Sequence, residues 1–183
     1  MRKAVIISFS GRKNGNCRHI AEIIKKHKEE TENTSIAAFS ELHVSPCGEC
    51  DYECFRDTNC PHHDDGLYEL YELVCSCDIV YYVVPNYCDY PCSDFFVFNE
   101  RSQCYFQKHP EGYPSYLKIR KKFIVISNTN IENFKKAFSI QVEEGTEPEI
   151  LFLQAKSFGK VSLDGDLMTS VQARKQVIDF IVC

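Results

Sequence analysis

One run of residues constrains the fold more than any other feature of the chain. Ile79 to Val84 is an unbroken series of apolar, β-branched and aromatic residues, bounded by Asp78 and Pro85. A strand that is apolar at every position is buried on both faces, which is typical of the middle of a parallel sheet. Parallel strands need long crossover connections, and these are usually helices. The run therefore predicts an α/β protein with helices on both faces of its sheet.

Short apolar runs alternate with helical patterns along the rest of the chain, as parallel-sheet proteins require. Strands are predicted over 3–8, 35–39, 79–84, 123–127 and 160–163, with Pro85 ending the third. Helices are predicted over about 20–26, 67–74, 93–101, 131–142, 149–158 and 166–181. Residues 47–65 are predicted to form a cysteine-rich loop and residues 102–122 an irregular insertion. Together these elements predict one three-layer, doubly wound domain over 1–183 with a five-stranded parallel sheet.

The composition and the charge restrict the compartment and the kinds of partner that we expect for the chain. It has 183 residues, of which 44% are hydrophobic and 26% charged, an ordinary globular balance. The formal net charge of −5 argues against a nucleic acid partner. The apolar run from Ala4 to Ile7 is too short for a secretory signal, and no stretch approaches the length of a membrane span. We therefore expect a cytoplasmic protein that binds neither nucleic acid nor a membrane.

The segment after the first strand carries the clearest ligand-binding signal. It reads SFSGRKNGNC over residues 8–17 and opens directly into a helix. Free backbone N–H groups and the positive end of the helix dipole form an anion site at such a point, and Arg12 adds a fork of donors. The glycine spacing matches neither the P-loop nor the dinucleotide fingerprint, which favours a monophosphate ligand. The alternative is a solvated turn that only caps the helix.

This segment resembles a known family. SGRKNGNC is similar to the SPRKNGNT motif of the NAD(P)H-dependent FMN reductases, a branch of the flavodoxin-like flavoproteins, with Gly11 in place of proline and Cys17 in place of threonine. The resemblance implies a flavodoxin-like fold, with the strand order 2-1-3-4-5, that holds the phosphate of FMN in this segment. The residues that it implies for the phosphate are Ser8, Ser10, Arg12, Asn14, Gly15, Asn16 and Cys17. The thiol of Cys17 is a weaker donor than a threonine hydroxyl, whereas its backbone N–H is unchanged.

A second segment, VVPNYCDYPCSDFFVFNER over residues 83–101, resembles the family's strand that runs into TPVY and a helix ending in Asp–Arg. Pro85 and Tyr87 match, and Glu100–Arg101 stands where the Asp–Arg pair is usual. The resemblance implies that Pro85, Asn86, Tyr87, Cys88 and Asp89 lie against the isoalloxazine ring. Asn128 and Thr129 follow the fourth strand, where flavodoxin-like folds often flank the flavin.

Eleven cysteines make a second kind of site possible. Cys47, Cys50, Cys54 and Cys60 follow the pattern C-x2-C-x3-C-x5-C. Four thiolates on one short loop suit a 4Fe–4S cluster or a structural zinc ion. The iron–sulfur branch of the same family carries a similar motif here, with two residues between its second and third cysteines where this chain has three. Free thiols are the alternative.

The resemblance implies an oxidoreductase in which NAD(P)H reduces bound FMN, and the flavin then reduces a quinone, a free flavin or another acceptor. FMN carries the chemistry, so no catalytic side chain is expected. One alternative is an electron-transfer iron–sulfur flavoprotein with its cluster on Cys47–Cys60, and another is a flavin-free, flavodoxin-like interaction module. The family is usually homodimeric, which makes a homodimer the expected assembly. The aromatic residues of the insertion are expected to cover the ring or reach the partner: Tyr105, Phe106, Tyr113 and Tyr116.

Overall fold

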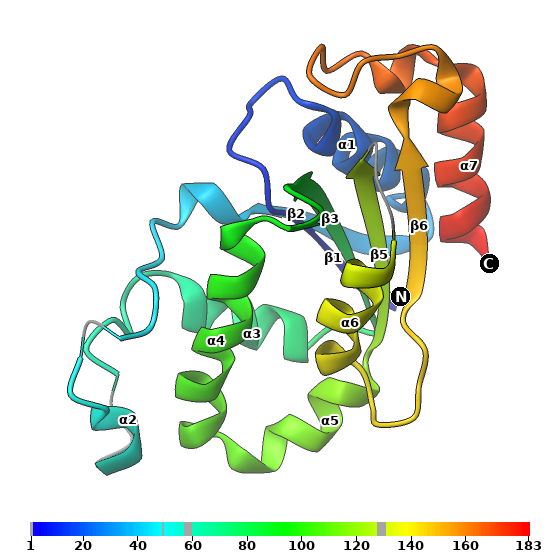
Figure 1. Cartoon of the computed structure of the whole chain (residues 1–183). Coiled ribbons are helices and arrows are strands. Elements are labelled where there is room, and N and C mark those ends of the chain that lie inside the picture. The colour runs from blue at the N-terminus through cyan, green and yellow to red at the C-terminus, as the bar shows by residue number, and fades with distance from the viewer. Residues whose placement is uncertain (1, 49, 57–59, 128–130) are drawn as a thin grey trace.

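A computed structural model describes residues 2–48, 50–56, 60–127 and 131–183 of the chain (Figure 1). Its centre is a parallel sheet in the order β2-β1-β3-β5-β6. These strands are β1 (Arg2–Ser8), β2 (Glu32–Ala38), β3 (Ile79–Tyr87), β5 (Arg120–Ser127) and β6 (Glu149–Gln154). Counted along the parallel strands, this is the predicted order 2-1-3-4-5, so the doubly wound α/β fold is confirmed. The sheet also has a sixth, two-residue strand, β4 (Tyr90–Pro91), which pairs antiparallel with the end of β3.

Helices cover both faces of the sheet (Figure 1). One face carries α1 (Asn16–Lys28) and α7 (Val171–Val182). The other carries α3 (Leu67–Cys75), α4 (Ser93–Lys108), α5 (Tyr113–Lys118) and α6 (Glu132–Phe138). A short helix, α2 (Glu53–Arg56), lies in the cysteine-rich loop, and single 3-10 turns occur at 39–41, 110–112, 139–141, 155–158 and 167–169. No helix in the described ranges combines the length and the apolar character that crossing a membrane would require.

The two faces hold two separate hydrophobic cores, because successive side chains of a strand point to opposite sides. In β1, Val5 and Ile7 belong to the core under α3 and α4, whereas Ala4 and Ile6 belong to the core under α1 and α7. The central strand β3 alternates in the same way and is fully buried from Val80 to Val84, as its apolar run predicts.

The prediction for the last strand is wrong. Residues 149–158, predicted as a helix, form β6 and a 3-10 turn, and residues 160–163, predicted as a strand, lie in the connection to α7. A short apolar run such as EILF fits a helix or a strand equally well by periodicity. Tertiary pairing decides the matter here, because β6 pairs with β5 from Lys122↔Glu149 to Ser127↔Gln154.

The prediction of an irregular insertion over 102–122 is also wrong. Helix α4 continues to Lys108, and a 3-10 turn and α5 lead directly into β5. The aromatic rings of this segment pack against Tyr71 instead of covering a ligand, with centroid distances of 5.1 Å for Tyr105, 5.6 Å for Phe106 and 5.9 Å for Tyr116. Tyr113 is partly exposed and packs on Phe106. Tyr105, Phe106 and Tyr116 therefore belong to the core under α3 and α4.

Candidate functional site

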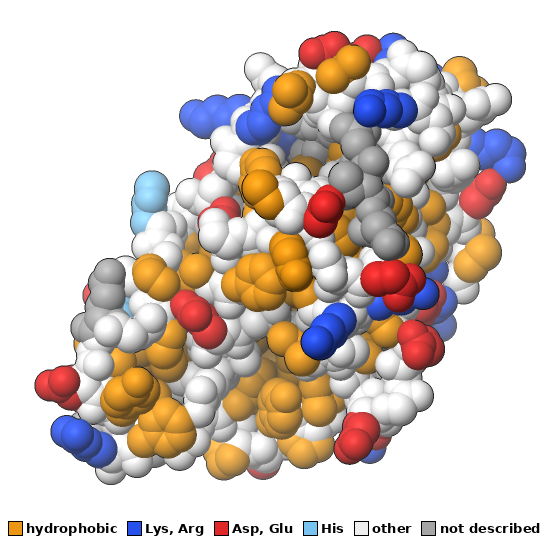
Figure 2. All heavy atoms as spheres, viewed as in Figure 1, with side chains coloured by type: hydrophobic (Ala, Val, Ile, Leu, Met, Phe, Trp, Pro, Cys, Tyr) orange, Lys and Arg blue, Asp and Glu red, His pale blue; other side chains and the backbone are white. Residues whose placement is uncertain are grey.

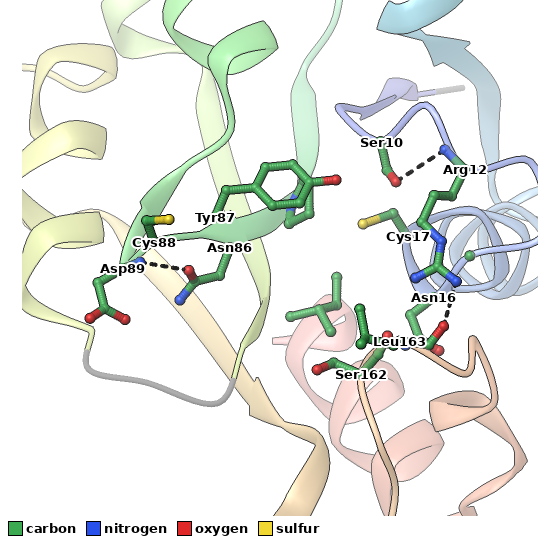
Figure 3. A pocket seen from close by; sticks show the side chains of 13 residues that line it. Ser10, Arg12, Asn16, Cys17, Asn86, Tyr87, Cys88, Asp89, Ser162 and Leu163 are labelled. Carbon is green, nitrogen blue, oxygen red and sulfur yellow. Dashed lines mark hydrogen bonds between the residues drawn. The ribbon is translucent and has the colours of Figure 1, made fainter.

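A cavity of about 260 Å³ lies at the carboxyl ends of β1 and β3 (Figure 3). From β1 the sheet extends to β2 on one side and to β3 on the other, so this is the switch point at which doubly wound sheets bind ligands. Five lining residues come from the first predicted segment: Ser10, Arg12, Gly15, Asn16 and Cys17. Five come from the second: Pro85, Asn86, Tyr87, Cys88 and Asp89. The two segments that the sequence singles out thus meet in one cavity.

The first loop, residues 9–15 between β1 and α1, leads into the helix start that borders this cavity. Helix α1 is 13 residues long, and no side chain caps its N-terminus at Gly15. The loop is closed by a hydrogen bond of 3.1 Å from the Gly15 N–H to the Arg12 carbonyl. A Cβ at Gly15 would lie 3.0 Å from the Cβ of Arg12, so the turn leaves little room for a side chain at this position. An uncapped helix start beside an arginine is a suitable anion site.

Ser8 and Asn14, predicted with this group, do not line the cavity. They line a second hollow of about 750 Å³ between the first loop and the end of β2. Ser8 is the last residue of β1 and is buried directly before the first loop begins. Neither side chain is placed to bind a ligand in the first cavity.

Three lining residues were missed by the sequence analysis: Ile126, Ser162 and Leu163. The last two belong to the β6–α7 connection, residues 155–170, which lies against the first loop (Figure 1). The guanidinium of Arg12 donates to the Leu163 carbonyl. The amide of Asn16 donates to the Ser162 carbonyl over 3.0 Å. No sequence motif predicts these two contacts. They exist because residues 149–154 form β6, which makes residues 155–170 the connection to α7.

The side chain of Asn16 is therefore used within the protein, in hydrogen bonds to the β6–α7 connection. Its Oδ1 accepts from the Leu167 N–H over 2.9 Å, while its Nδ2 holds Ser162. Nearby, His19 Nδ1 lies 3.0 Å from the Gly165 carbonyl oxygen. Only the backbone of Asn16 is left to meet a ligand, so its side chain fixes the position of the first loop.

The second wall of the cavity is the β3–β4 hairpin, residues 86–91. The prediction that Pro85 ends this strand is wrong. Strand β3 continues to Tyr87, and the chain then turns into β4. Since β1 pairs with β3 only as far as Val83, a proline at position 85 interrupts no pairing with β1. Cys88 and Asp89 both adopt left-handed conformations, with φ of 52° and 67°, as a two-residue hairpin turn demands.

Two hydrogen bonds hold the backbone of this turn in place. The Asp89 N–H donates to Asn86 Oδ1 over 2.9 Å, and Asn133 Nδ2 donates to the Asp89 carbonyl over 3.0 Å. Tyr87 projects its ring across the cavity toward Ser10 and Cys17, whereas the Asp89 carboxylate points away from the first loop (Figure 3). The hairpin thus offers an aromatic face and backbone groups to the cavity.

Two buried thiols lie beside the cavity. Burial raises the pKa of Cys17 to about 12, and the neighbouring Cys92 acts in the same direction, while Ser10 and Arg12 oppose it. The Cys92 thiol donates to the Phe9 carbonyl over 3.2 Å, and burial raises its pKa to about 12 as well. Both groups therefore stay protonated at neutral pH.

At about pH 8, iodoacetamide is expected to modify the exposed Cys88 long before Cys17 or Cys92. Only thiolates react, and a thiol of pKa about 12 is ionised to about one part in ten thousand at that pH. Peptide mass mapping over time measures the three rates, with urea-unfolded protein as the control in which all three react. Modification of Cys17 at the rate of Cys88 would contradict the packing described here.

The remaining predicted residues fall into two groups. Asn128 and Thr129 lie outside the described residues. In the cysteine-rich loop, Cys47 is exposed, Cys50 is half-buried, and Cys54 and Cys60 are buried. The described part of the chain contains no group of three or more Cys, His, Asp or Glu side chains placed to hold a metal ion. As placed, the four cysteines do not fit a 4Fe–4S cluster, and we derive no step through one.

Comparison with known proteins supports the fold. No family model matches the chain, and no curated protein matches it in sequence. Among solved structures, FerB, a flavoenzyme NAD(P)H:(acceptor) oxidoreductase from Paracoccus denitrificans, has a TM-score of 0.58 over 99% of this chain and 96% of its own, at 15% identity. The Trp repressor binding protein of Bacillus subtilis has a TM-score of 0.62 over 98% and 97%, at 13% identity.

A third solved structure is RosB with a bound 8-demethyl-8-formylriboflavin-5'-phosphate, which has a TM-score of 0.63 over 100% of this chain and 77% of its own, at 10% identity. At such low identities the likeness establishes the flavodoxin-like α/β fold alone.

Proposed function

We propose that the chain binds FMN in the cavity between the first loop and the β3–β4 hairpin, and acts as an NAD(P)H-dependent oxidoreductase. The observation that carries this proposal is the joining of two kinds of subsite in one cavity. One end has an uncapped helix start with Arg12, which suits a phosphate. The other end has the Tyr87 ring and hairpin backbone, which suit a flat heteroaromatic ring. FerB and RosB, whose names state a flavoenzyme and a bound riboflavin phosphate, share the fold.

The first loop would hold the phosphate. The Ser10 hydroxyl accepts from the backbone N–H of Arg12 at 3.4 Å, and both residues line the cavity. The backbone N–H groups at the start of α1 and the guanidinium of Arg12 supply positive potential there. These groups fit a monophosphate, which needs several donors converging on one small anion.

The hairpin would orient the ring. When bound, FMN would supply the atom that accepts hydride from NAD(P)H, which is the cofactor's own chemistry. Tyr87 offers a ring face and the backbone of Asn86 to Asp89 offers donors and acceptors to the ring edge. The hairpin turn is held by Asn86 and Asn133, so these contacts are organised before a ligand arrives.

FMN is expected to bind at least about a hundredfold more tightly than riboflavin, which lacks the phosphate. Two charge-assisted hydrogen bonds to the phosphate are together worth about 3 kcal/mol, which corresponds to that ratio. Quenching of flavin fluorescence during titration measures both dissociation constants. Equal affinity for the two flavins would show that the first loop is not a phosphate site.

The oxidoreductase activity is tested separately with FMN-loaded protein. Oxidation of NADH and of NADPH is followed at about 340 nm with a quinone, free FMN or ferricyanide as the acceptor. Turnover with one nucleotide and one acceptor would support the proposal. A protein that binds FMN and is reduced by neither nucleotide would instead favour an electron-transfer role, and one that binds no FMN would favour an interaction module.

A homodimer is part of the proposal. Tyr87, Tyr90 and Phe96 are 55%, 52% and 41% exposed on the hairpin and the first turn of α4. Hydrophobic side chains are also frequent on the face of the molecule that carries α4 (Figure 2). A second copy that covered this surface would close the ring end of the cavity. Light scattering of the FMN-loaded protein should give twice the mass of the chain, and a monomer would refute this part of the proposal.

A further inference from the structure

A buried arginine closes the cysteine-rich loop onto helix α4. Arg101 is completely buried, and its guanidinium donates to the Ser45 carbonyl over 2.6 Å, to Asp65 Oδ2 over 2.7 Å and to the His62 carbonyl over 3.0 Å. It therefore holds both ends of the loop at once. The preceding residue, Glu100, accepts from the Cys47 N–H over 2.7 Å.

One helical turn further along α4, Cys104 lies among the thiols of this loop. Its sulfur is 4.0 Å from the sulfur of Cys54, and the two residues are only 1% and 4% exposed. Burial raises the pKa of Cys104, and the neighbouring thiols of Cys60, Cys47 and Cys54 raise it further. The cluster of four thiols around Cys104 thus differs from the four cysteines of the sequence motif, since Cys104 is present and Cys50 is not among its neighbours in the described residues.

The exposed member of this cluster is Cys47. The other three residues are buried, whereas Cys47 is open to solvent, and the Cys104 thiol is one of the groups that act on the pKa of Cys47. A reagent from solution would therefore meet Cys47 first, and Cys104 is the thiol placed to react next.

We propose that Cys54 and Cys104 form a reversible disulfide that is reached through Cys47, and that the oxidant is a low-molecular-weight disulfide. An S–S bond is about 2.05 Å long, so the two sulfurs need to approach by about 2 Å. Disulfides that form in a reducing compartment are usually transient or redox-sensing, and a centre of this kind would connect α4 to the loop only under oxidising conditions. The inference does not depend on flavin binding.

The chemistry is three thiol–disulfide exchanges. The Cys47 thiolate attacks the small disulfide, forms a mixed disulfide and releases one small thiol. Cys104 loses its proton to solvent, and the small fraction present as thiolate, kept small because burial raises the pKa of Cys104, attacks the Cys47 sulfur within the same molecule, forms the Cys47–Cys104 bond and releases the second small thiol. Cys54 attacks the Cys104 sulfur, so that the Cys54–Cys104 bond forms and Cys47 leaves as a thiol. Overall, two protein thiols are oxidised and one small disulfide is reduced to two thiols.

The test uses the full chain, incubated without oxygen in oxidised glutathione at about pH 8.5, because burial raises the pKa of Cys47 and slows the exchange at neutral pH. Samples are trapped by alkylation and digested, and the linked peptides are identified by mass spectrometry. The expected main product is the Cys54–Cys104 link. Since this bond closes a long loop, with the two cysteines 50 positions apart, the oxidised chain should melt about 10 °C higher than the reduced chain.

Matched variants separate the roles of the individual cysteines. Cys47→Ser should slow formation of the link at least about tenfold, Cys54→Ser should stop the reaction at Cys47–Cys104, and Cys50→Ser should react like the unmodified chain. Circular dichroism confirms that each variant is folded. A glutathione adduct that stays on Cys47, a Cys47–Cys50 link, or an unchanged rate in Cys47→Ser would each overturn the proposal.

Discussion

Replacing Gly165 by alanine is expected to weaken FMN binding at least about tenfold, or about 1.4 kcal/mol. Gly165 lies in the β6–α7 connection with φ of 75°, and a Cβ there would lie 2.6 Å from the backbone carbonyl oxygen of Asn14. Such a contact cannot be relieved by a side-chain rotation, so the first loop has to move. Flavin fluorescence titration of the variant measures the loss.

The same connection provides a matched control. Gly159 also has a positive φ, 65°, but a Cβ there would meet nothing within 4 Å. Gly159→Ala should therefore cost about 1 kcal/mol of stability from the left-handed conformation and leave FMN binding unchanged. If Gly165→Ala bound FMN as tightly as Gly159→Ala, the connection would have no part in shaping the site.

Replacing Arg101 by methionine is expected to lower the free energy of unfolding by about 3–5 kcal/mol. The variant leaves the Asp65 carboxylate, 12% exposed, without its cation, and leaves the Ser45 and His62 carbonyls without this donor. Urea denaturation followed by circular dichroism measures the change. The flavin cavity is built from other residues, so FMN binding should persist at low temperature.

Arg120 provides the matched control, because Arg120→Met removes the same charge from a partly exposed position. It forms a two-pronged pair with Glu149 at 2.8 and 2.9 Å, but the side chains are 46% and 40% exposed. Arg120→Met should therefore cost less than about 1 kcal/mol. A loss in Arg101→Met no larger than this would mean that the buried arginine does not hold the cysteine-rich loop.

The sequence predicts the fold well where burial is uniform along a segment. The apolar run from Ile79 to Val84 has no polar position and is rich in β-branched and aromatic residues, which favours a strand inside a parallel sheet, and it is β3. The first loop is equally clear, because glycines, polar side chains and Arg12 occur together between a strand and a helix. Both signals are local, and both lead to the same cavity.

The errors arise where distant residues decide the structure. Residues 149–154 become a strand because β5 is available for pairing, and the aromatic residues after Arg101 stay helical because Tyr71 packs against them. The contact of Leu163 with Arg12 joins residues 151 positions apart, and Cys104 meets Cys54 across 50 positions. No spacing rule in a single sequence encodes such contacts.

The most direct test of the central claim is an absorption spectrum of the purified protein after incubation with FMN and gel filtration. We predict that FMN stays with the protein at about one per chain, with bands near about 370 and 450 nm, and that Gly165→Ala retains less. A wild-type protein that emerges colourless after this treatment would contradict the account, because the cavity between the first loop and the hairpin would then not be a flavin site.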